Sequence, residues 1–130
     1  MTKYPTIRAT MNELRKHISF HFNLVVSYSG AHDSGWFDGF WFTDKSHNHL
    51  LSDKLPADVR TIVEANERKI HEELYPLLST RFPGWEIGCG DVEGSSGHFI
   101  IDSKNNNIQQ THYVNYTSQE DESPSELEPY

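Results

Sequence analysis

The chain has only one cysteine among its 130 residues, Cys89, and this scarcity removes two classes of protein from consideration. A single cysteine cannot form an internal disulfide, and it cannot supply the paired thiolates of a structural zinc site. The sequence also has no long apolar run and no signal-peptide pattern. We therefore expect a cytoplasmic protein that has no disulfide framework and does not associate with a membrane.

Basic residues are also scarce, with 11 Lys and Arg against 19 Asp and Glu and a formal net charge of −8. A chain this acidic repels a phosphate backbone, and it lacks the attraction that dominates the affinity of proteins for nucleic acids. Direct nucleic-acid binding is therefore disfavoured.

Apolar residues make up 35% of the sequence, a low share, but three Trp, six Tyr and seven Phe can each bury a large area. The spacing of the apolar residues predicts one helix from about Thr6 to Phe20 and a second from about Asp53 to Phe82. Pro76 lacks an amide donor, so it should kink the second helix.

Runs of β-branched and aromatic residues between and after the helices predict strands. The resulting order is α-β-β-α-β-β-β, an α+β domain over residues 1–117 in which two helices pack on one face of an antiparallel sheet. Residues 118–130 are acidic and contain one leucine, so we expect a disordered acidic tail there. The expected strands span residues 22–28, 36–43, 85–89, 97–102 and 108–116.

The segment YSGAHDSGWF, residues 28–37, joins the first two expected strands. His32, Asp33 and Ser34 are side chains of the types found in hydrolytic triads, but neighbours in a tight turn seldom face one another. Asp and Ser side chains also bond to turn backbones, and the flanking glycines permit positive φ. A hairpin turn is therefore the favoured interpretation.

The second of these strands is rich in aromatic residues, and both of its faces carry large rings. Regular alternation places Trp36, Phe40 and Phe42 on one face, and Phe37 and Trp41 on the other. One face should pack on the helices. The other is either covered by a loop or free to bind a partner. The predicted binding residues are His32 and Asp33 of the turn and Trp36, Phe37 and Trp41 of the strand.

Three segments carry a resemblance to a known family: YSGAHDSG, GWEIGCGDVEGSSGHFIID and THYVNYT. They resemble an uncharacterised family of short bacterial proteins with an SGxxDSG segment and a GWE segment followed by GxFxxD. The resemblance implies a bacterial or mobile-element origin and an α+β domain. It brings no catalytic residue.

Two pairs of histidines are weak candidates for metal ligands. His17 and His21 are four residues apart, the spacing of paired zinc ligands if the helix continues through them. His47 and His49 lie in a polar loop where a neighbouring aspartate could complete a site. Solvated surface histidines are the favoured interpretation of both pairs, and no metal or other cofactor is predicted.

Cys89 lies between two glycines and is a weak candidate for a catalytic thiolate, with His98 or His112 as its base. Cysteines in strands are more often small buried apolar residues, and glycines beside them mark bulges. We therefore assign no catalytic residue.

The function favoured by these observations is a non-catalytic protein-interaction module of the accessory or inhibitor type, linked to mobile-element, phage or defence systems. It would bind a protein partner, or a second copy of itself, through the aromatic face. A metal-dependent or cysteine/histidine hydrolase is one alternative, and a small-molecule binding module is another.

Overall fold

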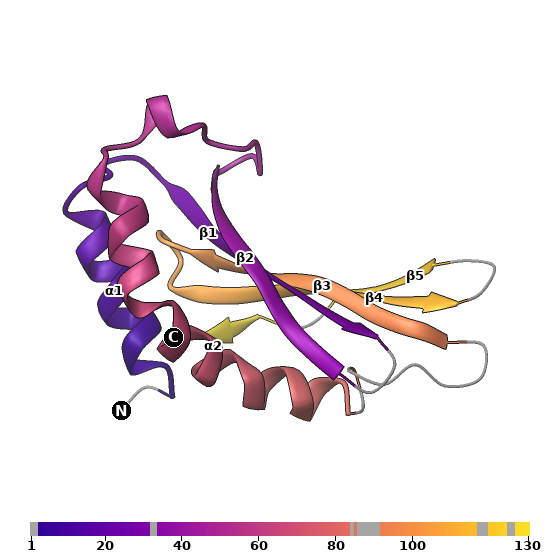
Figure 1. The fold of residues 1–130 in the computed structure, drawn as a ribbon. Coiled ribbons are helices and arrows are strands. Elements are labelled where there is room, and N and C mark those ends of the chain that lie inside the picture. The colour runs from indigo at the N-terminus through magenta and orange to yellow at the C-terminus, as the bar shows by residue number, and fades with distance from the viewer. Residues whose placement is uncertain (1–2, 32–33, 84, 86–91, 117–119, 125–126) are drawn as a thin grey trace.

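The structure is a computed structural model, and it describes residues 3–31, 34–83, 85, 92–116, 120–124 and 127–130. Helices and strands follow one another in the order α-β-β-α-β-β-β (Figure 1). The sheet is antiparallel, so the α+β fold expected from the sequence is confirmed.

The sheet is built from two long hairpins and two shorter strands that pair with β4. β1 (Phe22–Ala31) pairs with β2 (Ser34–Asp44) on one side and with β3 (Val92–Asp102) on the other. β3 pairs with β4 (Asn107–Tyr116), and β4 pairs with β5 (Glu120–Pro124). The spatial order is therefore β2-β1-β3-β4-β5, with β2 at one edge.

The first helix, α1 (Pro5–Arg15), is shorter than the sequence predicts. Tyr4, which precedes it, makes no side-chain cap, and the carboxylate of Glu73 takes that role from the second helix. It accepts the backbone N–H groups of Thr6 at 2.7 Å and Ile7 at 3.0 Å, which satisfies two amides that a helix start leaves unbonded. This contact fixes the start of α1 on its neighbour.

The second helix, α2 (Asp58–Arg81), follows a short 3₁₀ turn at Ser52–Lys54. It continues through Pro76 without a break, and Figure 1 shows that it bends, so its two halves run in different directions. A bend is expected because proline removes one backbone hydrogen bond. Within the described residues, no helix is long and apolar enough to cross a membrane.

The core lies between the helices and one face of the sheet. Alternate residues of β1, β3 and β4 point into it, and the helices cover this face, as predicted. Glu73 and the bend of α2 position the two helices over this face. The best-buried members of the core are Ile7, Met11, Leu14, Phe22, Leu24, Tyr28, Ile70, Leu74, Leu78, Phe99, Ile101 and Ile108.

The described residues of the acidic tail pair with β4. β5 pairs with one part of β4, and β6 (Glu128–Pro129) pairs with another part of it. Leu127 is 58% exposed, so apolar burial does not explain this order. The tail instead satisfies backbone groups at the outer edge of β4, which composition alone does not reveal.

The strand expected at residues 85–89 falls largely outside the described residues. Trp85 is described, and it lies in a turn with its side chain buried. The fifth strand of the observed sheet is β5 instead.

Candidate functional site: the open face of the sheet

A β-bulge in β2 decides which aromatic side chains face the solvent. Ser27 pairs with Gly39 and Tyr28 pairs with Phe37, so Asp38 is an extra residue in β2. Gly39 has a φ of 155°, a conformation that side chains disfavour. The extra residue reverses the alternation on its N-terminal side.

The predicted division of aromatics between the faces is therefore wrong at the start of β2. Trp36 lies on the same face as Trp41, while Phe37 points with Phe40 and Phe42 toward the helices. A bulge cannot be recognised from regular alternation, which explains the error.

Asp38 holds Trp36 in place on this face. Its carboxylate accepts the Ser29 hydroxyl at 2.6 Å and the Trp36 indole N–H at 2.7 Å. The Trp36 side chain is thus oriented while 46% of its surface stays exposed. An oriented, exposed tryptophan loses little side-chain entropy when a partner covers it.

Aromatic side chains continue across three further elements of this face. The Trp41 ring in β2 lies 6.3 Å from the His98 ring in β3, and His98 lies 6.4 Å from the Tyr113 ring in β4. His49, in the loop after β2, stacks on Trp41, with the ring centroids 5.5 Å apart and the ring planes at 19° to each other. We call the surface formed by Trp36, Trp41, His98 and Tyr113 the open face.

In the described part of the chain, no helix covers the open face. The buried residues of both helices belong to the core on the opposite side of the sheet. The loop that carries His49 reaches Trp41, and the first turn of α2 borders Trp41 at the edge of the sheet through Arg60. The side chains of Trp41, His98 and Tyr113 are half-buried by one another and by their neighbours.

Two hollows flank Trp41 at the outer edge of the sheet. The larger, of about 500 Å³, is bordered by Asp38, Glu64 and Glu67, and by one cation, Arg60. The smaller, of about 180 Å³, is mostly apolar. Its lining residues are Trp41, Phe42, Leu50, Leu55, Pro56, Ala57, Val59 and Arg60.

Phe37, a predicted binding residue, lies on the face of the sheet that the helices cover, which we call the covered face. Its ring stacks on the imidazole of His71 at 4.3 Å, with the two planes 4° apart. Burial lowers the pKa of His71, and the nearby carboxylate of Glu67 only partly opposes this effect. Phe37 therefore joins α2 to the sheet and is not part of the open face.

The covered face contains a buried polar cluster that the sequence did not reveal. The Tyr28 hydroxyl lies 2.6 Å from His112 Nδ1 and accepts the amide N–H of Gln110 at 2.9 Å. The Phe82 ring stacks on His112 at 3.8 Å. Burial lowers the pKa of His112 to about 4, so at neutral pH the imidazole is uncharged and its Nδ1 accepts a hydrogen bond from the Tyr28 hydroxyl.

A glycine makes this cluster possible. Tyr28 of β1, Gly97 of β3 and His112 of β4 are in register across the three strands. A Cβ at Gly97 would lie 2.5 Å from the Tyr28 hydroxyl and would also clash with the carbonyl of Thr111. The tyrosine therefore reaches His112 only because the middle residue has no side chain. The cluster is closed to solvent and serves packing.

The histidines considered as metal ligands lie apart. The helix ends at Arg15, His17 lies 3.8 Å from Glu13, and His21 pairs with Asp102 at 2.9 Å. Within the described ranges, no group of three or more metal-binding side chains is found.

The loop with His47 and His49 is organised by a carboxylate. Asp44 accepts the backbone N–H groups of Asn48 and Ser46. These bonds lower the pKa of Asp44, and the backbone bond from Asn48 contributes most to that shift. His47 has a φ of 67°, and His49 lies against Trp41, so the loop positions His49 on the open face.

The candidates for nucleophilic chemistry are not brought together in the described residues. His32, Asp33 and Cys89 lie outside them. His98 is described, and it lies on the open face between Trp41 and Tyr113, while His112 lies on the covered face. The two proposed bases thus project from opposite sides of the sheet.

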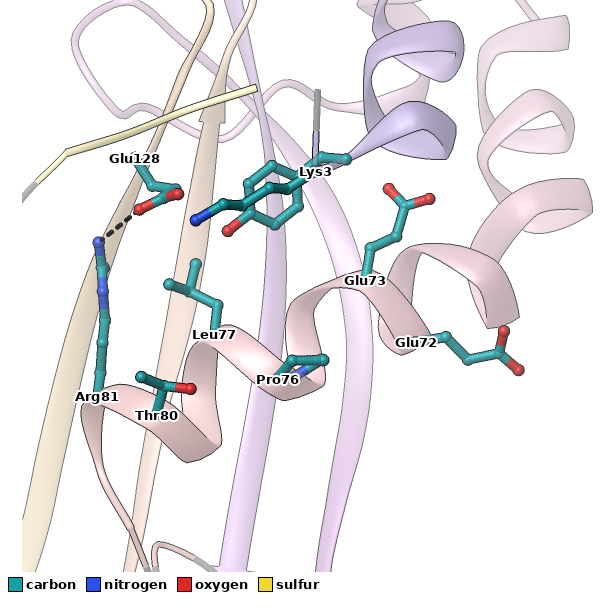
Figure 2. Close-up of a pocket in the computed structure, with 9 residues that line it drawn as sticks. Lys3, Glu72, Glu73, Pro76, Leu77, Thr80, Arg81 and Glu128 are labelled. Carbon is teal, nitrogen blue, oxygen red and sulfur yellow. Dashed lines mark ion pairs between the residues drawn. The ribbon is translucent and has the colours of Figure 1, made fainter. Parts of the chain in front are cut away.

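A further hollow of about 540 Å³ lies between the start of α1 and the C-terminal half of α2 (Figure 2). Most of its charged groups have internal partners: Arg81 pairs with Glu128 at 3.6 Å, Glu73 caps α1, and Glu72 pairs with Arg68. These contacts connect α2 to β6 and α1, so this hollow is part of the framework.

Comparisons with known proteins give no match: no family model, no curated protein and no solved structure matches this chain. Family membership stays a prediction from the sequence segments, and the argument for function rests on the geometry of the open face.

Proposed function

We propose that this chain is a non-catalytic module that binds a basic protein partner through the open face. The observation that carries the proposal is the group of exposed and half-buried rings, Trp36, Trp41, His98 and Tyr113, on the side opposite the helices. Tryptophan and tyrosine are enriched in protein interfaces because their large, stiff rings bury much area at small entropic cost. In this role the chain acts as an accessory or inhibitor protein.

The charge around Trp41 supports a basic partner. Asp38, Glu64 and Glu67 border the larger hollow beside it, and the whole chain carries a net charge of −8. Complementary charge speeds association and excludes acidic competitors. The smaller, apolar hollow would accept one apolar side chain of the same partner.

Paired variants test the aromatic part of the proposal. Trp36 and Phe20 are both 46% exposed, but only Trp36 lies on the open face. The partner is first captured with the unmodified chain and purified, and its affinity for each variant is then measured. It should bind Phe20→Ala as tightly as the unmodified chain and Trp36→Ala at least about tenfold more weakly. Equal binding of the two variants would contradict the proposal.

A second pair tests the charge. Glu64 pairs with Arg60 at 3.1 Å, and Glu72 pairs with Arg68 at 3.3 Å, both on the surface of α2. Only Glu64 borders the hollow beside Trp41. Glu64→Lys should slow association with the purified partner, while Glu72→Lys should not. If the chain instead forms a stable dimer through the open face, a second copy of the chain is the partner, and the proposal of a different, basic protein is contradicted.

A further inference from the structure

A separate hollow, of about 410 Å³, gathers positive charge on a chain that is otherwise acidic. It lies between the outer side of α1 and the turn that joins β3 to β4. Three of its lining residues are cations: Arg8, Arg15 and Lys104. The others are Asn12, Ser103, Asn106 and Tyr130.

Arg15 is held rigidly by neutral oxygen atoms. Its Nε donates to the Ser103 carbonyl at 2.8 Å, and its Nη1 donates to Asn12 at 2.6 Å. Its Nη2 donates to Asn106 at 2.5 Å and to the Tyr130 hydroxyl at 2.7 Å. None of these acceptors is a carboxylate, so the guanidinium is oriented while its charge is not neutralised by direct contact.

The other two cations of the hollow, Arg8 and Lys104, add further positive charge. Across the described residues, neither Arg8 nor Lys104 forms an ion pair. Asp102, at the start of the adjacent turn, accepts at Oδ1 from the backbone N–H groups of Lys104 and Asn105 and at Oδ2 from the Asn105 amide. Its ion pair is with His21 and not with a cation of the hollow. A concave surface lined by cations concentrates their field.

We propose that this hollow binds a small molecule through an anionic phosphate group. Arginine and lysine donors, with amide groups beside them, suit the several oxygens of a phosphate. The size of the hollow is that of a small-molecule site. The site is far smaller than a nucleic-acid groove, and the net charge of −8 opposes a long phosphate backbone. This inference does not depend on the proposed partner of the open face.

Titration with inorganic phosphate, followed by the amide NMR spectrum of the full chain, tests the site directly. Chloride keeps the ionic strength constant, so general screening does not imitate binding. We expect saturable shifts confined to α1 around Asn12 and Arg15 and to the turn at residues 103–106, with a Kd below about 5 mM. Glycerol phosphate should compete at the same site, and acetate should bind more weakly.

Matched variants assign the effect to the hollow. Arg8→Gln and Lys104→Gln should each weaken phosphate binding about tenfold. Lys16→Gln should change it less than twofold, because Lys16 lies next to Arg15 but pairs with Glu13 at 3.1 Å outside the hollow. The same spectra show whether each variant is folded. Shifts that do not saturate, or equal weakening in all three variants, would overturn the proposal.

Discussion

The two faces of the sheet carry similar residues with different consequences. On the covered face, Tyr28 and His112 are 1% and 2% exposed and bond to each other at 2.6 Å. On the open face, His98 and Tyr113 are half-buried and lie against Trp41. The same types of side chain therefore support packing on one side and are available for contact on the other.

The contrast is sharp because the two groups occupy neighbouring rows of the same strands. Tyr28, Gly97 and His112 form one row across β1, β3 and β4. His98 lies in the row on one side of it, and Tyr113 and Trp36 lie in the row on the other side. Successive residues of a strand point to opposite faces, so a difference of one position decides the environment. Substitutions in these rows should therefore have very different effects from substitutions in the row of Gly97.

The largest expected effect is on the covered face, at Gly97. Gly97→Ala should lower the free energy of unfolding by at least about 3 kcal/mol, because the new methyl group clashes with the Tyr28 ring and with the backbone of β4. Urea unfolding measures this change. A loss below about 1 kcal/mol would mean that the strands separate easily at this row.

The next effect depends on pH and belongs to His112. Burial lowers its pKa in the folded chain to about 4, below the ordinary value of 6.5, so the unfolded chain binds this proton more readily. Stability should therefore be complete above pH 6.5 and fall by up to about 3 kcal/mol as the pH drops toward 4. His71, whose pKa burial also lowers, contributes in the same direction.

Unfolding measured from pH 7 to pH 4 checks this slope, and NMR titration of the imidazole checks the pKa itself. His112→Gln should flatten the slope relative to the unmodified chain, because it removes the titrating group. A His112 pKa near 6.5 in the folded chain would contradict the prediction.

A smaller loss is expected from removing the hydroxyl of Tyr28. Tyr28→Phe leaves the Nδ1 of His112 and the amide of Gln110 without this buried partner, at a cost of about 2 kcal/mol. The pKa of His112 should change little, because burial is what lowers it. Thermal unfolding and the same imidazole titration measure both quantities.

The smallest expected effect is on the open face. Trp36→Ala should lower the free energy of unfolding by less than about 1 kcal/mol, because the side chain is 46% exposed and already solvated in the native state. Its effect should appear in partner binding instead. A stability loss above about 2 kcal/mol would show that Trp36 belongs to the core and would remove the contrast between the faces.

Much of the fold could be predicted from the sequence because its periodic patterns are strong. The apolar stripe of Ile7, Met11 and Leu14 predicts the first helix, and the aromatic run predicts β2. The order of elements followed from these patterns. The bulge at Asp38 could not be predicted, because the position of an extra residue in β2 depends on how β2 pairs with β1.

The site was only partly predictable for the same reason. The sequence predicts Trp36, Phe37 and Trp41 as binding residues; the two tryptophans lie on the open face, whereas Phe37 packs against the core. His98 and Tyr113 join the tryptophans only through the strand order, which brings β3 and β4 beside β1. Order in the acidic tail likewise depends on the free edge of β4, a tertiary property.

The bonds of Arg15 also bear on how the chain folds as it is made. Its partners Ser103, Asn106 and Tyr130 are 88, 91 and 115 positions further along the sequence. Synthesis proceeds from the N-terminus, and contacts between distant positions form slowly because a long loop must close first. Helix α1 is therefore made well before Ser103, Asn106 and Tyr130, and its outer side is secured only after these residues have been added and have packed against it.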